Sequence, residues 1–444
     1  MIQPRVMISA QSSGSGKTTI TCGILHALKR RGLDITSFKC GPDYIDPMFH
    51  SKAIGARSRN LDPFFTGKDL LCYLFARSAE GSDISVIEGA MGFYDGSRMD
   101  SSEDSSCDVS RRTGTPVIII IDGSGSSLSA MAVLKGMLEF EDNNIRGVIF
   151  NRMSEGVYRE LRPLVERMGV IPVGYVPKIE GAVLESRHLG LVLPSEISDI
   201  REKLDRIADV LETTLDIDSV ISIARSAPEL QYAVPSVPKM EPVRIGLADD
   251  DAFCFTYGDN IQLLMEMGAE IVPFSPLSDP ALPDVDLLIL SGGYPELYAE
   301  RLSSNASMRE DIRKKIVSGL PCVAECGGFM YLHDTMEGSD GKVYEMCHII
   351  PGATVNEHRL VRFGYVTLTS DRLDIGPVRG HEFHHWDSDN CGSDWTAENR
   401  RGKRYSCIHD DGRIIAGYPH FYYYSNISFA AEIMRRASAY KRSV

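Results

Sequence analysis

A glycine-rich loop near the amino terminus joins a short apolar strand to a helix. The apolar run RVMISA precedes SSGSGKTT, Ser12 to Thr19, and a helical pattern follows over residues 18–32. Backbone N–H groups in such a loop and the amino end of the helix attract phosphate. A plain glycine-rich turn is the alternative, but it would leave a lysine in the turn without an anion. The segment therefore predicts a nucleotide-binding α/β domain, in which Lys17 reaches the β- and γ-phosphates and the Thr18 hydroxyl binds magnesium.

Strands and helices alternate along the chain in two halves. The apolar runs DISVIEG, PVIIIID and RGVIFN alternate with helical patterns in the first half, and the alternation restarts at VRIGLADD. This pattern predicts parallel sheets with helices on both faces. Between the halves, residues 227–243 contain four prolines, which break both ladders and helices. We expect an N-terminal domain over 1–226, a linker over 227–242 and a C-terminal domain over 243–444.

Charge and cysteine content narrow the class of protein. The formal net charge of -14 argues against nucleic acid as the main partner, because binding to a phosphate backbone needs a positive surface. The ten cysteines include no C-x-x-C pair, so they indicate neither structural zinc nor thioredoxin-like chemistry and are typical of a reducing compartment. No run of about 18 apolar residues predicts a membrane span. We expect a cytoplasmic protein that binds neither nucleic acid nor membrane.

Acidic residues in two segments suit a magnesium site beside the phosphate loop. Glu88 ends the apolar strand of VIEGAMGFYDG, and Asp43 and Asp46 lie in the proline-bounded loop GPDYIDP. Ligands bind at the carboxyl ends of strands in open α/β sheets, and magnesium prefers oxygen ligands and phosphates. Solvated loop residues or helix caps are the alternative. We predict that Thr18, Asp46 and Glu88 hold the ion.

A cysteine on a sharp turn indicates a second site. In PCVAECGGFMYL, Cys326 lies between an apolar strand and a helical stretch, where a nucleophile is exposed and the helix lowers its pKa. Gly292 and Gly293 end a neighbouring strand, and with Gly327 they are candidates for an oxyanion and glutamine site. His420 follows the strand-like RIIAGY and is the candidate base. A buried, inert cysteine is the alternative.

The segment HEFHH, His381 to His385, matches the zinc-protease pattern H-E-x-x-H. That pattern requires a helix with both histidines on one face. Gly380 precedes the segment and no helical period surrounds it. We therefore predict a strand, with residues that face the substrate or a domain interface.

Together these segments resemble the cobyrinate a,c-diamide synthase family. The resemblance covers nearly the whole chain in order, through SSGSGKTT, FKCGPDYIDPMFH, SRNLD, IEGAMGFYDG, ESRHLGL, SGGYPE, AECGGFMYL, RGHEFHHW and PHFYYYSN. It implies two three-layer α/β domains. The N-terminal one would be a P-loop domain like dethiobiotin synthetase. The C-terminal one would be a flavodoxin-like class I glutaminase of the triad type that lacks the usual third acid.

The resemblance implies an ATP- and glutamine-dependent carbon–nitrogen ligase of cobalamin biosynthesis, with Mg²⁺ as cofactor. ATP would phosphorylate the a and c acetate side chains of cobyrinate, and ammonia released from glutamine would displace the phosphate. The family includes enzymes that act on hydrogenobyrinate and on nickel-sirohydrochlorin, in the coenzyme F430 pathway, so these macrocycles stay open as substrates. The implied partners are a corrin-type polycarboxylate macrocycle, ATP and glutamine, and a homodimer is compatible with them.

Roles carry over to matching positions. Cys326 resembles the nucleophile, His420 its base and Glu88 the magnesium acid. The loop that handles substrate and phosphate comprises Asp43, Tyr44, Ile45 and Asp46. The residues implied in ATP binding are Ser13, Gly14, Gly16, Lys17, Thr18, Thr19 and Asn151, the last beside adenine. Four basic residues are candidates for a polyanionic substrate, with surface solvation as the alternative: Arg57, Arg59, Arg187 and His188.

The sequence departs from common patterns at three points. Gln11 stands where the phosphate loop usually has its first glycine, and Ala324 replaces the first glycine of G-x-C-x-G. No glutamate follows His420 in an H-x-E pattern. A P-loop regulatory ATPase with an inert glutaminase-like domain is the alternative from another class. A relative such as cobyric acid synthase is a third hypothesis, against which GPDYIDP and RHLGL weigh.

Overall fold

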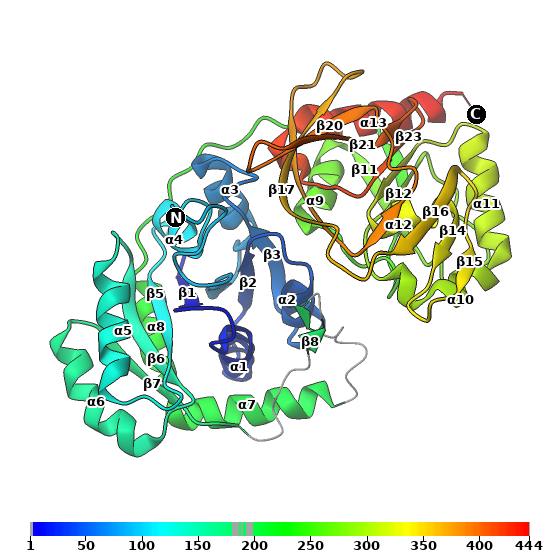
Figure 1. The fold of residues 1–444 in the computed structure, drawn as a ribbon. Helices are drawn as coiled ribbons and strands as arrows, with labels where there is room; N and C mark the ends of the chain where they lie inside the picture. The colour runs from blue at the N-terminus through cyan, green and yellow to red at the C-terminus, as the bar shows by residue number, and fades with distance from the viewer. Residues whose placement is uncertain (1–2, 180–185, 188–189, 192–198, 444) are drawn as a thin grey trace. The chain divides into compact units, whose positions relative to one another are not determined.

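The computed structural model describes residues 3–179, 186–187, 190–191 and 199–443. The chain forms two compact units, Met1–Pro235 and Ser236–Val444 (Figure 1). Their boundary lies in the proline-rich segment, where residues 227–242 form neither helix nor strand. Both units alternate strands and helices, as the sequence predicts.

Both ends of the predicted linker pack against the unit that they adjoin. The Arg5 guanidinium donates to the Pro228 carbonyl at 2.8 Å. At the other end, the Met240 N–H donates to the Met267 carbonyl at 2.7 Å. Each contact fixes the path of the chain as it leaves or enters a unit.

A seven-stranded parallel sheet forms the centre of the N-terminal unit, in the order β3-β2-β4-β1-β5-β6-β7. Its strands are β1 Arg5–Ala10, β2 Ile35–Cys40, β3 Arg57–Leu61, β4 Ile84–Glu88, β5 Val117–Asp122, β6 Ile145–Asn151 and β7 Ile171–Val176. Strands such as β5, VIIIID, are apolar along nearly their whole length because helices cover both faces of the sheet. The central strands β2, β4 and β1 therefore end side by side.

Helices lie on both faces of this sheet. Their bounds are α1 Lys17–Arg30, α2 Ile45–Met48, the π-helix η1 Phe49–Ala53, α3 Lys68–Ser78, α4 Ser106–Thr113, α5 Leu128–Glu139, α6 Glu155–Arg167, α7 Ile200–Thr214 and α8 Ile217–Arg225. Helix α1 packs so closely on α7 that a Cβ on Gly23 would lie 2.4 Å from the Leu211 side chain. Two short strands, β8 Ser186–Arg187 and β9 Gly190–Leu191, pair with each other.

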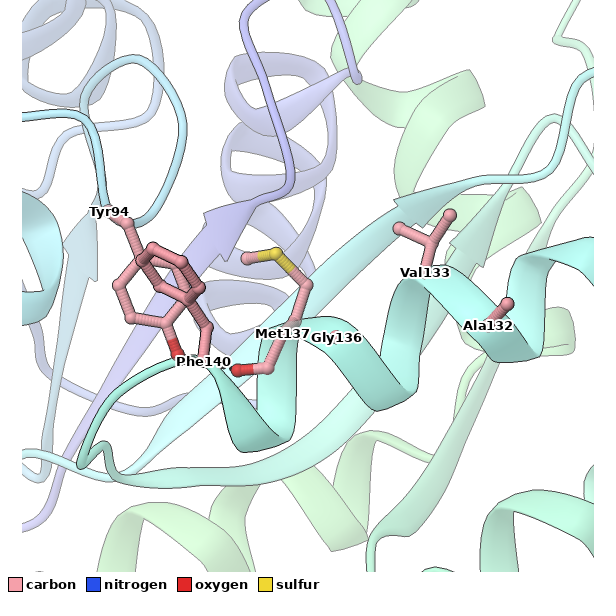
Figure 2. A pocket seen from close by; sticks show the side chains of 6 residues that line it. All are labelled: Tyr94, Ala132, Val133, Gly136, Met137 and Phe140. Carbon is pink, nitrogen blue, oxygen red and sulfur yellow. Dashed lines mark hydrogen bonds between the residues drawn. The ribbon is translucent and has the colours of Figure 1, made fainter. Parts of the chain in front are cut away.

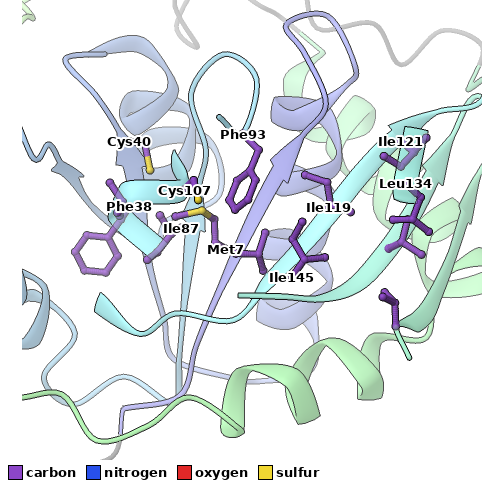
Figure 3. Packing of buried hydrophobic residues seen from close by; sticks show 14 of the residues in the cluster. Met7, Phe38, Cys40, Ile87, Phe93, Cys107, Ile119, Ile121, Leu134 and Ile145 are labelled. Atoms are coloured by element: carbon purple, nitrogen blue, oxygen red, sulfur yellow. The ribbon is translucent and has the colours of Figure 1, made fainter. Parts of the chain in front are cut away.

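The core of the N-terminal unit lies between the sheet and helices α3 to α6 (Figure 3). Strand residues such as Met7, Ile87 and Ile119 point into it and meet helix residues such as Cys107 and Leu134. All five are buried. The core holds the strands rigid, so the loops at their carboxyl ends start from fixed positions.

The C-terminal unit is built on a six-stranded sheet with the order β11-β10-β12-β13-β23-β22. Its strands are β10 Val243–Ala248, β11 Ala269–Phe274, β12 Leu287–Leu290, β13 Cys322–Glu325, β22 His409–Asp410 and β23 Ile414–Gly417, all parallel except β22. The helices of this unit are α9 Gly258–Met267, η3 Pro295–Leu297, α10 Ala299–Ser304, α11 Ala306–Val317, α12 Gly327–Tyr331, η4 Tyr423–Ser425 and α13 Ile427–Lys441.

A largely antiparallel region, whose strands lie between α12 and β22 except for β24, interrupts this α/β pattern. It forms a four-stranded and a five-stranded sheet, in the orders β15-β14-β16-β19 and β21-β20-β17-β18-β24. Their strands are β14 His333–Glu337, β15 Val343–Glu345, β16 Ile350–Asn356, β17 Arg362–Ser370, β18 Val378–His384, β19 Trp386–Ser388, β20 Trp395–Asn399, β21 Arg404–Cys407 and β24 His420–Phe421. The predicted three-layer α/β domain does not include these two sheets. Within the described ranges, no helix is long and apolar enough to cross a membrane.

Candidate functional sites

The phosphate-binding loop joins β1 to α1, as predicted. Gly14 and Gly16 have φ angles of 75° and 90°, a left-handed backbone that favours glycine. A Cβ on Gly16 would also lie 2.3 Å from Nδ2 of Asn151. Asn151 ends β6 and donates from Nδ2 to the Ser15 carbonyl at 2.8 Å. The structure thus brings Asn151 to the loop, which it braces, while its contact with adenine stays a prediction.

Lys17 begins α1 with its ammonium group turned back onto the loop. It donates to the Ser12 carbonyl at 3.1 Å and to the Met91 carbonyl. Burial and then the positive charge of Lys39 together lower the pKa of Lys17 to about 8. Ser13 is exposed in the loop, and Thr19 follows Thr18 on α1. A cation is therefore held where the loop is predicted to bind phosphates.

The three residues predicted to bind magnesium come together at the carboxyl ends of the central strands. The Thr18 hydroxyl donates to Oε1 of Glu88 at 2.7 Å and to Oδ2 of Asp46 at 3.4 Å. Glu88 is the last residue of β4, and Asp46 belongs to the short helix α2. The Thr18 hydroxyl thus lies within hydrogen-bonding distance of both carboxylates, and hydroxyl and carboxylate oxygens are ligands that a hard cation prefers.

Two residues that the sequence analysis missed complete this cluster. Nζ of Lys39, at the end of β2, lies 2.9 Å from Oε1 of Glu88 and also contacts Oδ2 of Asp46. Nε2 of His50 lies 3.0 Å from Oε2 of Glu88. Burial opposes the charge of Lys39, but the carboxylates of Asp46 and Glu88 raise its pKa well above the usual value. The motif FKCGPDYIDPMFH contains both residues, yet only the fold shows that they face Glu88.

Lys39 and His50 also set the charge of Glu88. Burial alone would raise the pKa of this carboxyl group. The Lys39 ammonium and then the His50 imidazole outweigh burial and hold the pKa below its ordinary value. Glu88 is therefore a buried anion, and the neighbouring cation offsets the free-energy cost of removing its charge from water.

The predicted substrate and phosphate loop follows β2 directly. Asp43 accepts the N–H groups of Ile45 and Asp46 at 2.8 and 3.2 Å, so its carboxylate caps α2. Tyr44 and Ile45 are both buried. Asn60 on β3 donates to the Asp43 carbonyl at 2.7 Å and ties the loop to the sheet. The loop is thus held in place beside Glu88.

Among the basic substrate candidates, Arg57 lies away from this cluster. Arg57 begins β3 beside Thr36, at the opposite end of the strand from the cluster, and is exposed. Arg59 donates to the Ser58 carbonyl at 2.8 Å. Arg187 lies in the short strand β8, and His188 lies outside the described residues. Their contacts with substrate stay predictions.

Cys326 lies on the predicted sharp turn between β13 and α12. Its φ and ψ angles are 47° and -104°, a conformation that non-glycine residues rarely adopt outside functional turns. Gly328 has no space for a side chain, because a Cβ there would lie 2.1 Å from the Leu290 carbonyl oxygen. The N–H of Gly327 opens α12, where no intrahelical acceptor exists. The turn therefore presents both a thiol and an N–H donor.

The glycines predicted for the oxyanion and glutamine site border the same turn. A Cβ on Gly292 would lie 2.4 Å from Cε1 of His420. A Cβ on Gly327 would lie 3.2 Å from the backbone nitrogen of Gly293. The structure therefore brings Gly292, Gly293, Gly327 and His420 around Cys326, as the sequence analysis expected.

His420 is buried in β24 and interacts with Cys326. Burial lowers the pKa of its imidazole, but the interaction with Cys326 and then the Glu325 carboxylate outweigh burial and raise the pKa to about 9. The position two residues later, where an H-x-E pattern has its acid, is Tyr422. Its hydroxyl donates to Oδ2 of Asp259 at 3.1 Å. Cys326 and His420 therefore form a pair suited to nucleophilic attack on a carbonyl carbon.

The HEFHH segment lies on a strand, as predicted. β18 spans Val378–His384 and pairs with β24, with His381 opposite His420. The two imidazole rings stack with their centroids 4.9 Å apart. Nδ1 of His384 lies 2.6 Å from the Trp386 carbonyl. This strand buttresses the candidate base, and the segment does not have the helical geometry of a zinc protease.

An apolar hollow of about 330 Å³ lies apart from both sites, on the outer face of α5 (Figure 2). The residues that line it are Tyr94, Ala132, Val133, Gly136, Met137 and Phe140. It contains no predicted site residue, so the two polar clusters stay the candidate sites.

Comparisons with known proteins agree with this division into two sites. Residues 6–189 match the CobQ/CobB/MinD/ParA nucleotide binding domain. Residues 244–426 match the CobB/CobQ-like glutamine amidotransferase domain. Among solved structures, the MinD cell division protein of Aquifex aeolicus aligns with 52% of this chain and 99% of its own at 14% identity and a TM-score of 0.31, which is too distant to carry an argument.

Curated relatives match along almost the full length. The cobyrinate a,c-diamide synthase of Listeria monocytogenes is 39% identical over 95% of this chain and 97% of its own. The enzyme of the same name from Salmonella typhimurium is 41% identical over 86% of this chain and 85% of its own. That from Picrophilus torridus is 40% identical over 95% of this chain and 96% of its own. The chain belongs to the cobyrinate a,c-diamide synthase family.

Proposed function

We propose that the chain amidates the a and c acetate carboxylates of cobyrinate, with ATP to activate each carboxylate and glutamine as the nitrogen donor. One observation carries the proposal: a single chain holds a phosphate loop with converging carboxylates and a cysteine–histidine pair on a sharp turn. Cobyrinate is proposed as the substrate because the similar proteins are named cobyrinate a,c-diamide synthase. ATP, glutamine and a corrin-type macrocycle are therefore the proposed partners.

In the N-terminal unit, the proposed reaction converts a carboxylate, which is a poor acyl donor, into a reactive acyl phosphate. A carboxylate oxygen of the macrocycle attacks the γ-phosphorus of ATP, which forms an acyl phosphate and releases ADP. Ammonia then attacks the acyl carbon, and phosphate leaves as the carboxamide forms. Lys17 would move from the carbonyls of Ser12 and Met91 to the phosphates, where its charge stabilises the transferring group.

The oxygen cluster fits a magnesium ion. Thr18, Asp46 and Glu88 offer the hydroxyl and carboxylate oxygens that magnesium prefers, and the Lys39 ammonium already lies against both carboxylates. When bound, the ion would neutralise charge on the phosphates. The contacts of the Lys39 ammonium support the proposal that positive charge is favoured at this cluster.

In the C-terminal unit, the proposed reaction releases ammonia from glutamine. The Cys326 thiol gives its proton to His420, and the sulfur attacks the amide carbon of glutamine. The N–H groups of Gly327 and Gly293 are proposed to stabilise the oxyanion. The imidazolium of His420 then protonates the leaving ammonia, and water hydrolyses the thioester to glutamate and restores the thiol.

The substrate can be named by mass spectrometry. Cobyrinate, hydrogenobyrinate and nickel-sirohydrochlorin are each incubated with the protein, ATP, magnesium and glutamine. We expect two carboxylate-to-amide conversions on cobyrinate. If hydrogenobyrinate or nickel-sirohydrochlorin is converted instead, the proposed amidation reaction is right, but cobyrinate is not the substrate. If none is converted while glutamine is hydrolysed, the proposed substrate class is wrong.

A further inference from the structure

The proposed glutaminase pair lacks a third acid at the usual place in the sequence. A catalytic imidazole is held in one tautomer and orientation when a carboxylate accepts the N–H of its second nitrogen. Tyr422 occupies the H-x-E position, and its hydroxyl donates to Asp259. An acid that orients His420 must therefore come from another element.

Glu325 is an acid in contact with His420. It is the last residue of β13 and directly precedes Cys326. Its Oε2 atom lies 3.5 Å from Nδ1 of His420, and both side chains are almost completely buried. The backbone N–H of Phe421, next to the histidine, also donates to the Glu325 carboxylate. Glu325 thus contacts His420 through both the ring and the adjoining backbone.

The unusual backbone of Cys326 explains how adjacent residues reach one ring. In a regular strand, successive side chains point to opposite faces of the sheet. Cys326 has a φ of 47°, so the strand ends there and the direction of the next side chain changes. Glu325 meets His420 at Nδ1, which leaves Nε2 as the nitrogen for Cys326.

Other titratable groups that face His420 are less suited to this role. His381 stacks on the ring, and burial lowers its pKa well below the usual value, so it is neutral. Burial lowers the pKa of His384 to about 4. Burial raises the pKa of Glu382, as it does that of Glu325, but the carboxylate of Glu382 accepts the hydroxyl of Tyr405. Glu382 is thus engaged by another partner.

We propose that Glu325 is the third member of the glutaminase centre, a positioning residue whose carboxylate orients His420 through Nδ1. This inference rests on the proposed roles of Cys326 and His420. The carboxylate keeps a proton on Nδ1, directs Nε2 at the thiol and stabilises the imidazolium that forms when Cys326 gives up its proton. The centre is then complete without an acid two residues after the histidine.

The test compares glutaminase kinetics of the full-length wild type and Glu325→Gln across pH. We expect kcat to fall about 10- to 1000-fold, a smaller loss than the roughly 10⁴-fold fall seen when the aspartate of a serine-protease triad is neutralised, with little change in KM for glutamine. Since the His420 imidazolium must protonate the leaving ammonia, wild-type activity should fall at alkaline pH. Without the carboxylate, this alkaline limb should move to lower pH.

The matched control is Glu432→Gln. Glu432 is another buried carboxylate of the same unit, and it pairs with Arg435 and Arg436 on α13. We expect this variant to keep the wild-type pH profile. If Glu325→Gln does not fold, Glu325→Asp replaces it: the shorter acid keeps the charge but lies farther from the ring, so kcat should fall while the alkaline limb stays near its wild-type position.

Two outcomes separate this inference from the function on which it depends. Wild-type kcat and pH profile in folded Glu325→Gln, or wild-type kcat in Glu325→Asp, would overturn the role of Glu325. Cys326→Ser is assayed in parallel. If it still hydrolysed glutamine, the proposed centre itself would be wrong, whatever Glu325 does.

Discussion

Among single residues, Lys17 most directly couples pH to nucleotide binding. Burial lowers its pKa to about 8 in the free protein. Phosphates favour the charged form, so ATP binding should take up a proton when the pH is above that value. We predict that ATP affinity weakens as pH rises through about 8. Titration calorimetry in buffers of different ionisation enthalpy would measure the proton uptake.

The control for this prediction is Lys17→Arg, which stays charged through the alkaline range. Its ATP affinity should vary less with pH than that of the wild type. If ATP affinity depended on pH in the same way in both proteins, Lys17 would not be the group that causes the pH dependence.

Removal of the lysine charge should abolish synthesis regardless of the nitrogen source. We predict that Lys17→Ala loses macrocycle amidation with either glutamine or ammonia, because both use the same acyl phosphate. Lys135→Ala is the matched control, since Lys135 is exposed on α5 of the same unit. Amidation is followed by mass spectrometry. Ammonia-driven synthesis by Lys17→Ala at the wild-type rate would rule out this nucleotide site.

Among single residues, the sequence analysis found those that belong to a short motif. It missed those whose partners lie on another strand or helix. Lys17, Thr18 and Cys326 belong to short motifs at the start of a helix, and the residue types and spacing of these motifs indicate their chemistry. Lys39 and Glu325 are in strands, where a charged residue at the end of an apolar run has no distinctive pattern. Only the register of neighbouring strands places Lys39 beside Glu88.

Among the elements, the turn from β13 to α12 should tolerate little change. A Cβ on Gly328 would lie 2.1 Å from the Leu290 carbonyl oxygen. We predict that Gly328→Ala destabilises the C-terminal unit by about 1–3 kcal/mol, as overpacking commonly does, and lowers glutaminase activity by moving Cys326. Urea unfolding and glutamine hydrolysis measure the two effects.

The matched control is a helical glycine with open space around it. Gly136 lies within α5, and a Cβ there would meet no atom within 4 Å. Gly136→Ala should stabilise by about 0.5–1 kcal/mol, because alanine is the better helix former. Equal effects of the two substitutions would contradict the steric explanation.

The sequence predicted the parallel elements well because each is a continuous apolar run or an amphipathic helix. RVMISA became β1, PVIIIID became β5 and VDLLILSGG contains β12. The antiparallel strands between α12 and β22 were not predicted, apart from HEFHH. Strand β17 shows why: RFGYVTLTS is mostly half-buried, so its signal depends on partners that the local sequence does not identify.

For the whole molecule, apolar packing inside each unit predicts two separate unfolding events. The described residues form an apolar cluster within the N-terminal unit and another within the C-terminal unit. We predict two calorimetric transitions. Magnesium with an ATP analogue should raise one of them, and a glutamine analogue that alkylates Cys326 should raise the other, since a ligand stabilises the unit that binds it. A single transition raised by both ligands would contradict this independence.

The central claim is that nitrogen from glutamine, released at Cys326, enters a carboxylate activated by ATP. It is tested most directly by isotope labelling. Wild type and Cys326→Ser are incubated with cobyrinate, ATP, magnesium, glutamine labelled with ¹⁵N in its amide and unlabelled ammonium. We predict that the wild-type diamide carries ¹⁵N in its amides, while Cys326→Ser forms only unlabelled diamide. Unlabelled product from the wild type, or labelled product from Cys326→Ser, would contradict the account.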